Sequence, residues 1–397
     1  MRLHVTGAVA AVALFALGCD QNNNPGDPVD LATMALDSAA VPASPTNLHA
    51  EDPAAAALGR RLFFDKRMSA DGAVACVSCH DPSKGFSDPR PVSLGVAGRP
   101  GGRHSMPITA AALQPFLFWD GRADSLWSQP LKAIEGHAEM DESRTAVAHF
   151  IDVEYREDYE SVFGPMPDLK GLPASARPGE AAWNSMSAKS RDDVQRVFAS
   201  VGKSIEAYER KLICADTRFD RWTRGEITLT AAEQSGADSF ARNGCIGCHS
   251  GPSFSDGKFH AIGVGGVGAD LGRAAGIPLL LADPFNGVGA YSDDPVAGQR
   301  LLSIAASEGP GPRAFRTASL RGVGQRESFG HLGDLRDLRQ FITQTYRGGG
   351  RGGSNNGGNA LDLDPLLRGV DADNVDEIIA FLRTLDCPSP SPDLLAP

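Results

Sequence analysis

The chain of 397 residues is 42% hydrophobic and 22% charged, so it is long enough for two globular domains with separate cores. Its net charge of -11, from 38 Lys and Arg against 49 Asp and Glu, argues against nucleic acid or an anionic membrane surface as a partner. Aromatic residues make up only 7%, whereas 45 glycines and 27 prolines predict long irregular connections and disfavour doubly wound α/β folds.

Residues 1–18 have the pattern of a secretory signal, with Arg2 ahead of an apolar run and small residues before Cys19. Residues 16–19 are similar to a bacterial lipobox, so we expect lipid attachment at Cys19. The alternative is ordinary cleavage nearby, which leaves a spare thiol. No later apolar run is long enough to span a bilayer. The sequence therefore predicts a periplasmic protein that touches the membrane only through that lipid.

The segment that follows Cys19 has little sequence pattern that predicts regular structure. Residues 20–47 are rich in Asn, Pro, Ser and Ala without a periodic apolar pattern, so we expect residues 19–50 to form a flexible linker. Asp52 followed by Pro53 is typical of a helix start, which marks the expected beginning of the folded part.

Helical periodicity accounts for most of the regular structure that the sequence predicts. Apolar residues at helical spacing predict a long helix over residues 193–212. A capping box from Thr230 to Glu233 predicts the start of another helix. Two further amphipathic helices are expected over residues 335–346 and 375–385. Because no run of alternating strand residues stands out, the sequence predicts a mainly α fold.

The cysteines carry the strongest signal in the chain, because four of the seven lie in two C-x-x-C-H motifs, at residues 76–80 and 245–249. Two thiols three residues apart lie about one helical turn from each other, so both can add to the vinyl groups of one haem. The next residue, His80 or His249, can then coordinate the iron. Zinc or a redox dithiol is disfavoured by that histidine. The sequence predicts two covalent haem c groups, attached to Cys76, Cys79, Cys245 and Cys248.

Three cysteines lie outside these motifs. If Cys19 carries a lipid, Cys214 and Cys387 remain as one pair in an exported protein, where disulfides persist. We expect a disulfide that ties the middle of the chain to its carboxyl end. The alternative is two separately buried thiols.

Several further segments accompany the haem motifs. They are LFFD at 62–65, DPSKGFSD at 81–88, FWDGRADSL at 118–126, FDR at 219–221, SGP at 250–252, DLGR at 270–273, FRTASLR at 315–321 and FLRTL at 381–385. Together they resemble the bacterial di-haem cytochrome c peroxidases and their relatives of the MauG type, over nearly the whole chain from Leu58 to Leu385.

The resemblance implies two cytochrome c-like domains, each with one covalent haem c and long irregular loops. Residues 51–225 would form the peroxidatic haem domain, and residues 226–397 the electron-transfer haem domain, whose tail we expect to pack back on the first. In the family a Trp relays electrons between the haems, and Trp119 matches that residue. The alternative for Trp119 is a packed core aromatic.

The resemblance also assigns a pair of side chains to the pocket beside the first haem, Gln129 and Glu139. A carboxylate such as Glu139 can move the proton that O–O cleavage of peroxide requires, and Gln129 would orient peroxide or water. The alternative for Glu139 is a solvated charge at a helix end.

The chain departs from the family at two places near the first haem. Peroxidases that need activation by reduction carry a distal His where this chain has Val96, which cannot ligate iron, so the peroxide site is expected to be open at rest. Family members often bind calcium between the domains through an Asn after an Arg. Here Arg103 is followed by His104, a poor calcium ligand, which argues against that ion.

The sixth ligand of the second haem is the largest departure. The family uses a Met there, or a Tyr in MauG-type relatives, a little after the segment at 315–321. No Met follows Met186 in this chain, and an alignment without gaps places Glu327 at the ligand position. Glu327, His331 or water is expected to fill the site, with Glu327 favoured. His331 matches a histidine common to the family that is not the usual ligand.

The sequence thus predicts an enzyme that reduces hydrogen peroxide with electrons from a small redox protein, a cytochrome c or a cupredoxin. One alternative is a MauG-like enzyme that oxidises a protein or another substrate. The other is a non-catalytic di-haem electron carrier, which Gln129, Glu139 and Val96 disfavour because a carrier needs no open pocket with acid–base groups. The sequence leaves the donor, the physiological substrate and the oligomeric state open, a dimer included.

Overall fold

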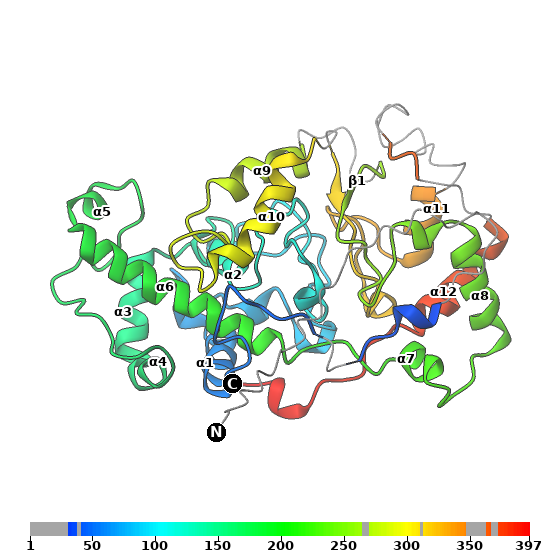
Figure 1. The fold of residues 1–397 in the computed structure, drawn as a ribbon, viewed down its shortest axis with the longest axis horizontal. Coiled ribbons are helices and arrows are strands. Elements are labelled where there is room, and N and C mark those ends of the chain that lie inside the picture. Colours follow the sequence, from blue (N-terminus) through cyan, green and yellow to red (C-terminus); the bar gives the residue numbers. More distant parts are fainter. Residues whose placement is uncertain (1–30, 38–40, 264–269, 310–312, 347–362, 367–371) are drawn as a thin grey trace, which may run out of the picture.

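The computed structural model describes residues 31–37, 41–263, 270–309, 313–346, 363–366 and 372–397. The protein is mainly helical, as expected (Figure 1). Its α-helices are α1 (Pro53–Phe64), α2 (Ser128–Glu135), α3 (Arg144–Glu154), α4 (Arg156–Phe163), α5 (Ala181–Ser185), α6 (Ala188–Glu209), α7 (Arg218–Thr223), α8 (Ala231–Arg242), α9 (Arg273–Leu281), α10 (Pro295–Ser307), α11 (Leu338–Tyr346) and α12 (Val375–Arg383). Two short strands, β1 (Phe259–His260) and β2 (Phe315–Arg316), pair antiparallel.

The helix starts follow the expected local chemistry. The Asp52 side chain caps α1 by accepting from the backbone amides of Ala54 and Ala55, and Pro53 opens the helix. Thr230 and Glu233 form the expected capping box at the start of α8. These caps satisfy backbone amides that no helical carbonyl can reach.

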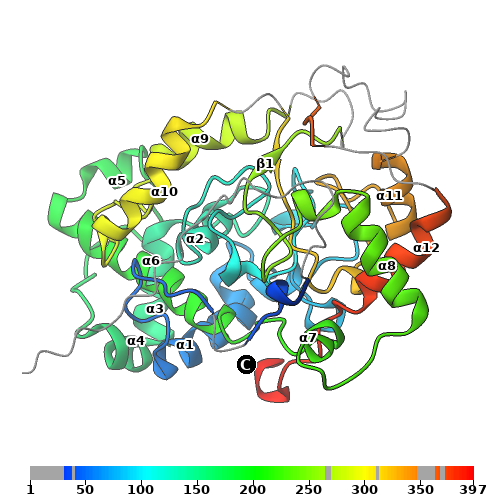
Figure 2. The same ribbon diagram turned by 45° about the vertical axis from the view of Figure 1, so that its right-hand side comes forward.

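Two helix pairs organise the apolar packing (Figures 1 and 2). α1 lies against α6 so closely that a Cβ atom at Gly59 would collide with the carbonyl oxygen of Ser204. α12 lies equally close to α8, where Gly236 meets the backbone of Glu377. Glycine permits both close approaches because it has no side chain.

Two large hydrophobic clusters form around these pairs. The first is built from α1, α2, α3 and α6, and includes Trp127 and Phe198. The second is built from α7, α8 and α12 with the second haem motif nearby, and its centre is a group of four aromatic rings with centroids 5.1 to 6.4 Å apart. The four rings belong to Phe219, Phe240, Phe254 and Phe381.

The expected flexible linker is wrong for the described part of residues 31–50. Leu31 and Met34 pack in the second cluster, and Asn47 lies buried against α6. These few apolar and amide side chains dock on a preformed surface, which a search for periodic patterns cannot detect. Residues 19–30 and 38–40, and with them Cys19, lie outside the described residues.

The carboxyl end packs against α1 and α6, within residues 51–225, as expected. The Tyr208 hydroxyl donates to the carbonyl of Leu394 at 2.6 Å, and Leu394 and Leu395 pack beside Phe63. Cys214 and Cys387 form a disulfide, the pairing that the cysteine count suggested. The chain is therefore closed on itself between its middle and its end.

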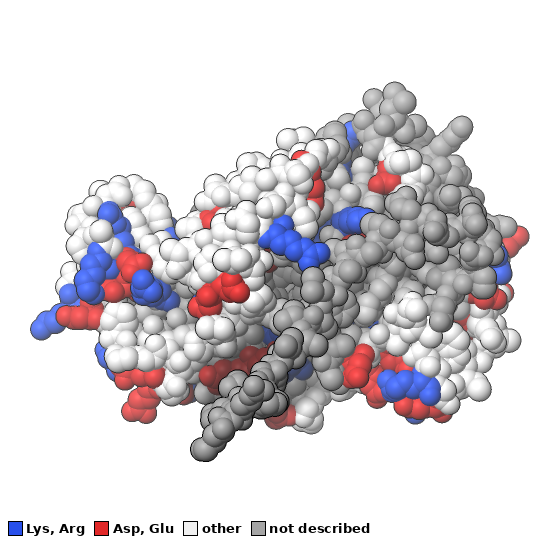
Figure 3. Space-filling view, viewed as in Figure 1, with Lys and Arg blue, Asp and Glu red and all other residues white. Residues whose placement is uncertain are grey.

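The face shown in Figure 3 mixes acidic and basic side chains, and the surface over α9 and α10 is largely uncharged. Large apolar side chains are exposed there, at Leu279 and Leu281 of α9 and Val296 of α10. None of the described helices combines the length and hydropathy that a bilayer crossing requires.

Candidate functional site

Both C-x-x-C-H motifs fold in the same way. Each begins with a short 3-10 turn, Cys76–Ser78 or Cys245–Gly247, and the backbone amide of the following histidine donates to the first cysteine's carbonyl at 2.9 Å. In both, the histidine Nδ1 lies within hydrogen-bond distance of a Phe carbonyl a few residues later. The distances are 3.3 Å from His80 to Phe86 and 3.0 Å from His249 to Phe254.

The repeated bond orients both histidines for iron. A ring that donates from Nδ1 to a carbonyl keeps a free lone pair on Nε2, which is the arrangement that metal-binding histidines use. Both carbonyls come from residues with left-handed backbone, Phe86 at φ 55° and Phe254 at φ 49°. Burial lowers the pKa of His80 to about 4 and also lowers that of His249, so both rings stay neutral.

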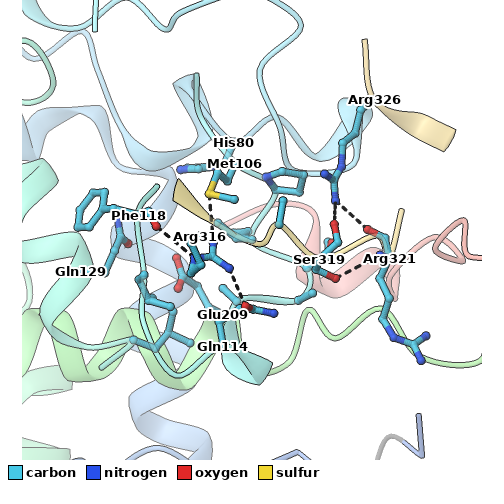
Figure 4. Close-up of a pocket in the computed structure, with 18 residues that line it drawn as sticks. His80, Met106, Gln114, Phe118, Gln129, Glu209, Arg316, Ser319, Arg321 and Arg326 are labelled. Carbon is cyan, nitrogen blue, oxygen red and sulfur yellow. Dashed lines mark hydrogen bonds between the residues drawn. The ribbon is translucent and has the colours of Figure 1, made fainter. Parts of the chain in front are cut away.

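His80 opens into a first cavity of about 620 Å³, its open side included (Figure 4). Gln129 reaches this cavity from α2, and Glu209 reaches it from the end of α6. The structure therefore brings the first expected ligand and the expected distal glutamine to one cavity. Glu209 is a lining group that the sequence analysis missed.

Glu139 lies in the loop after α2, close to the first haem motif. Burial raises the pKa of the Cys76 and Cys79 thiols, and the charge of Glu139 contributes to both shifts. Burial also raises the pKa of Glu139 itself, and Arg122 opposes that shift. The Glu139 carbonyl accepts from the amide of Val96 at 2.8 Å, so the residue at the family's distal-His position supports the backbone of this loop.

His249 opens into a second, larger cavity of about 1180 Å³, its open side included. Its lining combines apolar and aromatic side chains with polar and charged ones. The lining residues include Trp119, Phe315, Phe329, Phe341, Tyr346, Met106, His104, His260 and the haem-motif residues Cys245 and Cys248.

The wall between the cavities carries Trp119. Phe118 lines the first cavity and Trp119 the second, so two consecutive residues face the two sides. The Trp119 indole Nε1 donates to the carbonyl of His104 at 2.8 Å, and its ring meets His331 edge-on with centroids 6.3 Å apart. The indole is thus held between the cavities rather than in either hydrophobic cluster.

Two buried guanidinium groups lie on this wall, and their charge bears on whether haem fits the two cavities. Arg316 and Arg326 line both cavities, and neither forms an ion pair with a carboxylate among the described residues. Arg316 bonds only neutral groups, namely the Phe118 carbonyl, the Gln114 and Thr317 oxygens and the Met106 sulfur. Burial lowers the pKa of both arginines to about 10.

A buried guanidinium without a counter-charge destabilises the folded protein, so these two positions favour the binding of an anion. Haem propionates are carboxylates of the required charge, and Arg can bind them through two parallel hydrogen bonds. The four motif cysteines are free thiols, available for attachment. Thiols, oriented histidines and unpaired cations all fit a haem in each cavity.

The position that calcium would use is occupied by an ion-pair network. Arg103 pairs with Asp270 at 2.7 Å and with Asp120 at 2.6 Å, so the carboxylates next to it are engaged. His104 turns its Nδ1 to the carbonyls of Arg90 and Pro91.

Neither expected sixth ligand lines the second cavity. The Glu327 carboxylate pairs with Lys84 at 2.9 Å, and about half of its side-chain surface, 49%, is exposed. His331 stacks on Phe315 with ring centroids 3.9 Å apart, behind the cavity wall. The prediction of Glu327 as a ligand is therefore wrong in this structure. The residue that an ungapped alignment places at the ligand position lies on a loop that faces solvent.

Tyr346 occupies the second cavity instead. It ends α11, lines the cavity with His249, and has its pKa raised by burial, with the Cys245 and Cys248 thiols adding to the shift. A signal was present in the sequence, since the resemblance allows a Tyr ligand and only two tyrosines follow the second motif. The other, Tyr291, bonds Asp192 and Gln195 of α6 and lines neither of the two cavities.

Comparisons with known proteins agree with this geometry. The sequence profile of the family described as di-haem cytochrome c peroxidase matches residues 53–228. The cytochrome-c peroxidase IdrP2 of Denitromonas iodatirespirans is 30% identical over 334 residues, covering 83% of this chain and 80% of the relative. The methylamine utilization protein MauG of Methylorubrum extorquens is 29% identical over 299 residues, covering 75% and 70%.

Solved structures share the fold. A MauG-like protein associated with microbial copper homeostasis superposes with a TM-score of 0.64 at 22% identity, covering 90% of this chain and 97% of that one. The diheme peroxidase BthA of Burkholderia thailandensis gives a TM-score of 0.64 at 22% identity, covering 88% and 89%. The identity and coverage of the first relative, together with the matched profile, show that the chain belongs to the family of di-haem cytochrome c peroxidases and MauG proteins.

Proposed function

We propose that the protein reduces hydrogen peroxide to water with electrons from a small redox protein, in the periplasm. The single observation that carries this proposal is the first cavity, where His80 and Gln129 meet and Glu139 lies alongside. A haem that only transfers electrons has no use for such groups.

Each C-x-x-C-H motif would hold one haem c through two thioethers and its histidine. Residues 51–225 would carry the peroxidatic haem and residues 226–397 the electron-transfer haem. Bound there, the haem iron supplies the redox chemistry and an open position for peroxide. Arg316 and Arg326 would neutralise propionates between the two sites.

Glu139 acts as the proton-moving group of the first cavity. Cleavage of the peroxide O–O bond is easier when a proton moves from one oxygen to the leaving oxygen, and a positioned carboxylate can transfer it. Because burial raises the pKa of Glu139, its proton affinity is closer to neutral pH than that of an exposed Glu. Gln129 orients peroxide by hydrogen bonding from α2.

Trp119 would carry electrons across the wall between the cavities. Its indole faces the second cavity, while the adjacent Phe118 lines the first. The donor, a cytochrome c or a cupredoxin, would deliver electrons to the haem on His249. Tyr346 would be the second protein group that holds this haem.

A MauG-like oxidation of a protein or another substrate is the second candidate function. Tyr346 favours it, because the resemblance associates a Tyr ligand with MauG-type members and a Met ligand with the peroxidases. An anionic oxygen ligand stabilises ferric iron, so the second haem would accept electrons poorly from high-potential donors.

Steady-state assays with peroxide and reduced cytochrome c would separate the two candidates. Rapid donor oxidation that depends on peroxide supports the peroxidase. Peroxide consumption without donor oxidation, even with cupredoxin in place of cytochrome c, would contradict it and favour the MauG-like reaction.

The amino terminus bears on localisation and not on chemistry. Export follows from the signal pattern of residues 1–18, and Cys19 would carry the lipid. Mass spectrometry of the mature amino-terminal peptide would show whether Cys19 is acylated. A peptide that begins elsewhere would contradict lipid attachment.

A further inference from the structure

One buried carboxyl on the wall of the first cavity has no assigned role. Glu209 is only 4% exposed, and its Oε2 atom has no hydrogen-bond partner among the described residues. Its side chain points into the cavity that His80 and Gln129 also line (Figure 4). Native proteins rarely leave a buried carboxyl oxygen unpaired, because the unmet bond is costly.

Peroxide reduction creates a demand for protons at this place. Conversion of one hydrogen peroxide to two waters consumes two electrons and two protons. The electrons are supplied by the donor protein through the second haem. The protons must reach the reacting oxygens inside the cavity, and a group that hands one over must regain one.

A line of polar side chains leads from the surface to Glu209. Glu206 lies one helical turn earlier on α6 and accepts from the side-chain amide of Asn47 at 2.9 Å. Ser44, which is half-buried in the amino-terminal segment, lies close enough to Glu206 to lower the pKa of its carboxyl. Residues three apart on a helix share a face, so Glu206 and Glu209 are neighbours.

We propose that Glu209 is the residue that delivers protons to the first cavity, supplied from solvent through Ser44 and Glu206. This rests on the proposed function and adds a proton route to it. The transfer is a hop of one proton from the Glu206 carboxyl to the Glu209 carboxylate, and then from Glu209 to the cavity. Each carboxyl is re-protonated from the solvent side, so no other reactant is needed.

The surroundings of Glu209 suit a carrier of protons. Its charged and titratable neighbours are Glu206 on the same helix, Cys76 on the haem segment and Tyr208, which itself faces Arg60 of α1. Across the cavity the wall carries Arg316, Arg321 and Arg326. Burial, and then the charge of Glu206, raises the pKa of Glu209 to about 8, so the group holds a proton at neutral pH and can release it.

The test uses the holoprotein with both haems and compares Glu209→Gln with a matched control. Asp193→Asn is that control, because Asp193 pairs with the exposed Lys189 near the start of the same helix, away from the polar line. Glu209→Gln is expected to lower kcat at least about tenfold, with an unchanged KM for peroxide and a larger solvent isotope effect. Glu206→Gln should act in the same direction and Asp193→Asn should not.

A second readout does not depend on turnover. Infrared difference spectra on reduction of the haems should contain a protonated-carboxyl band in the wild type and in Asp193→Asn that is missing in Glu209→Gln. An unchanged isotope effect together with an unchanged band in Glu209→Gln would overturn the inference. If the wild type does not turn over peroxide but the band is still lost, the proposed function fails while the proton site stands.

Discussion

The two cavities begin from the same local structure and diverge beyond it. In both, a 3-10 turn presents a histidine whose Nδ1 faces the carbonyl of a left-handed Phe. The first cavity adds Gln129 and nearby Glu139, whereas the second adds aromatic rings and Tyr346. We therefore expect both motifs to attach haem in the same way, and the groups contributed from distant segments to determine what each haem does.

The proposed proton transfer at the first cavity is the most sensitive point of this comparison. Glu139→Gln should slow O–O cleavage by a factor on the order of 10² to 10⁴, because the amide cannot accept and return a proton. Rapid mixing with peroxide measures this rate, and haem content measured in parallel should stay at two per chain. Glu142→Gln, which alters the carboxylate that accepts from the amide of Ser143, is the matched control. Equal rates in the wild type and Glu139→Gln would place the chemistry elsewhere.

The disulfide tests how far the two regions depend on one another. Cys214 and Cys387 link the segment after α6 to the chain after α12, so their replacement by Ser should lower the free energy of unfolding by about 2 to 5 kcal/mol. Denaturant unfolding measures the change. Mass spectrometry of unreduced, alkylated wild type should show the two peptides linked, and alkylation of both thiols without reduction would refute the bond.

Tyr346 distinguishes the second cavity, and its removal should leave the first unaffected. Tyr346→Phe should raise the reduction potential of the haem on His249 by on the order of 100 mV, since an anionic oxygen donor that stabilises ferric iron is lost. Tyr291→Phe is the control, because Tyr291 bonds Asp192 outside both cavities. Redox titration followed by magnetic circular dichroism would show the change, and an unaltered second haem would exclude Tyr346 as its ligand.

The pH dependence of stability follows from Glu209 in the first cavity. Its pKa is raised from 4.5 to about 8 in the folded protein, so it stabilises the fold fully below pH 4.5. That stabilisation is lost as pH rises to about 8, by about 1.4 kcal/mol per pH unit. Glu209→Gln should therefore gain stability relative to the wild type between about pH 5 and about pH 8. Parallel unfolding curves for the two proteins across this range would contradict the shift.

Glu327 should show the smallest effect. Its ion pair with Lys84 is exposed, and such pairs contribute about 0 to 1 kcal/mol. Glu327→Ala should leave the spectra of both haems unchanged. A change in the second haem on this substitution would restore Glu327 as its ligand and contradict the position of the side chain.

The sequence predicted what depends on local pattern. Capping at Asp52 and Thr230, the helix that became α6, and the pairing of Cys214 with Cys387 all appear in the structure. The haem motifs carry their chemistry in five consecutive residues, and the structure folds both alike.

The sequence could not predict what depends on where distant segments meet. Tyr346 reaches the second cavity from the end of α11, whereas the ungapped alignment placed the ligand at Glu327, which lies on an exposed loop. Glu209 could not be identified from its helical pattern, because the local sequence does not show which face of a helix borders a cavity. The packing of Leu31 and Met34 could not be predicted for the same reason.

The difference between the cavities predicts an asymmetry in the resting protein. We expect the fully oxidised holoprotein to contain one high-spin haem, at His80, because Val96 leaves no distal ligand, and one low-spin haem held by His249 and Tyr346. Stopped-flow mixing of this oxidised protein with peroxide tests the claim most directly. We expect an immediate change in the high-spin absorption without prior reduction. A resting protein with two low-spin haems that stays inert to peroxide until it is reduced would contradict it.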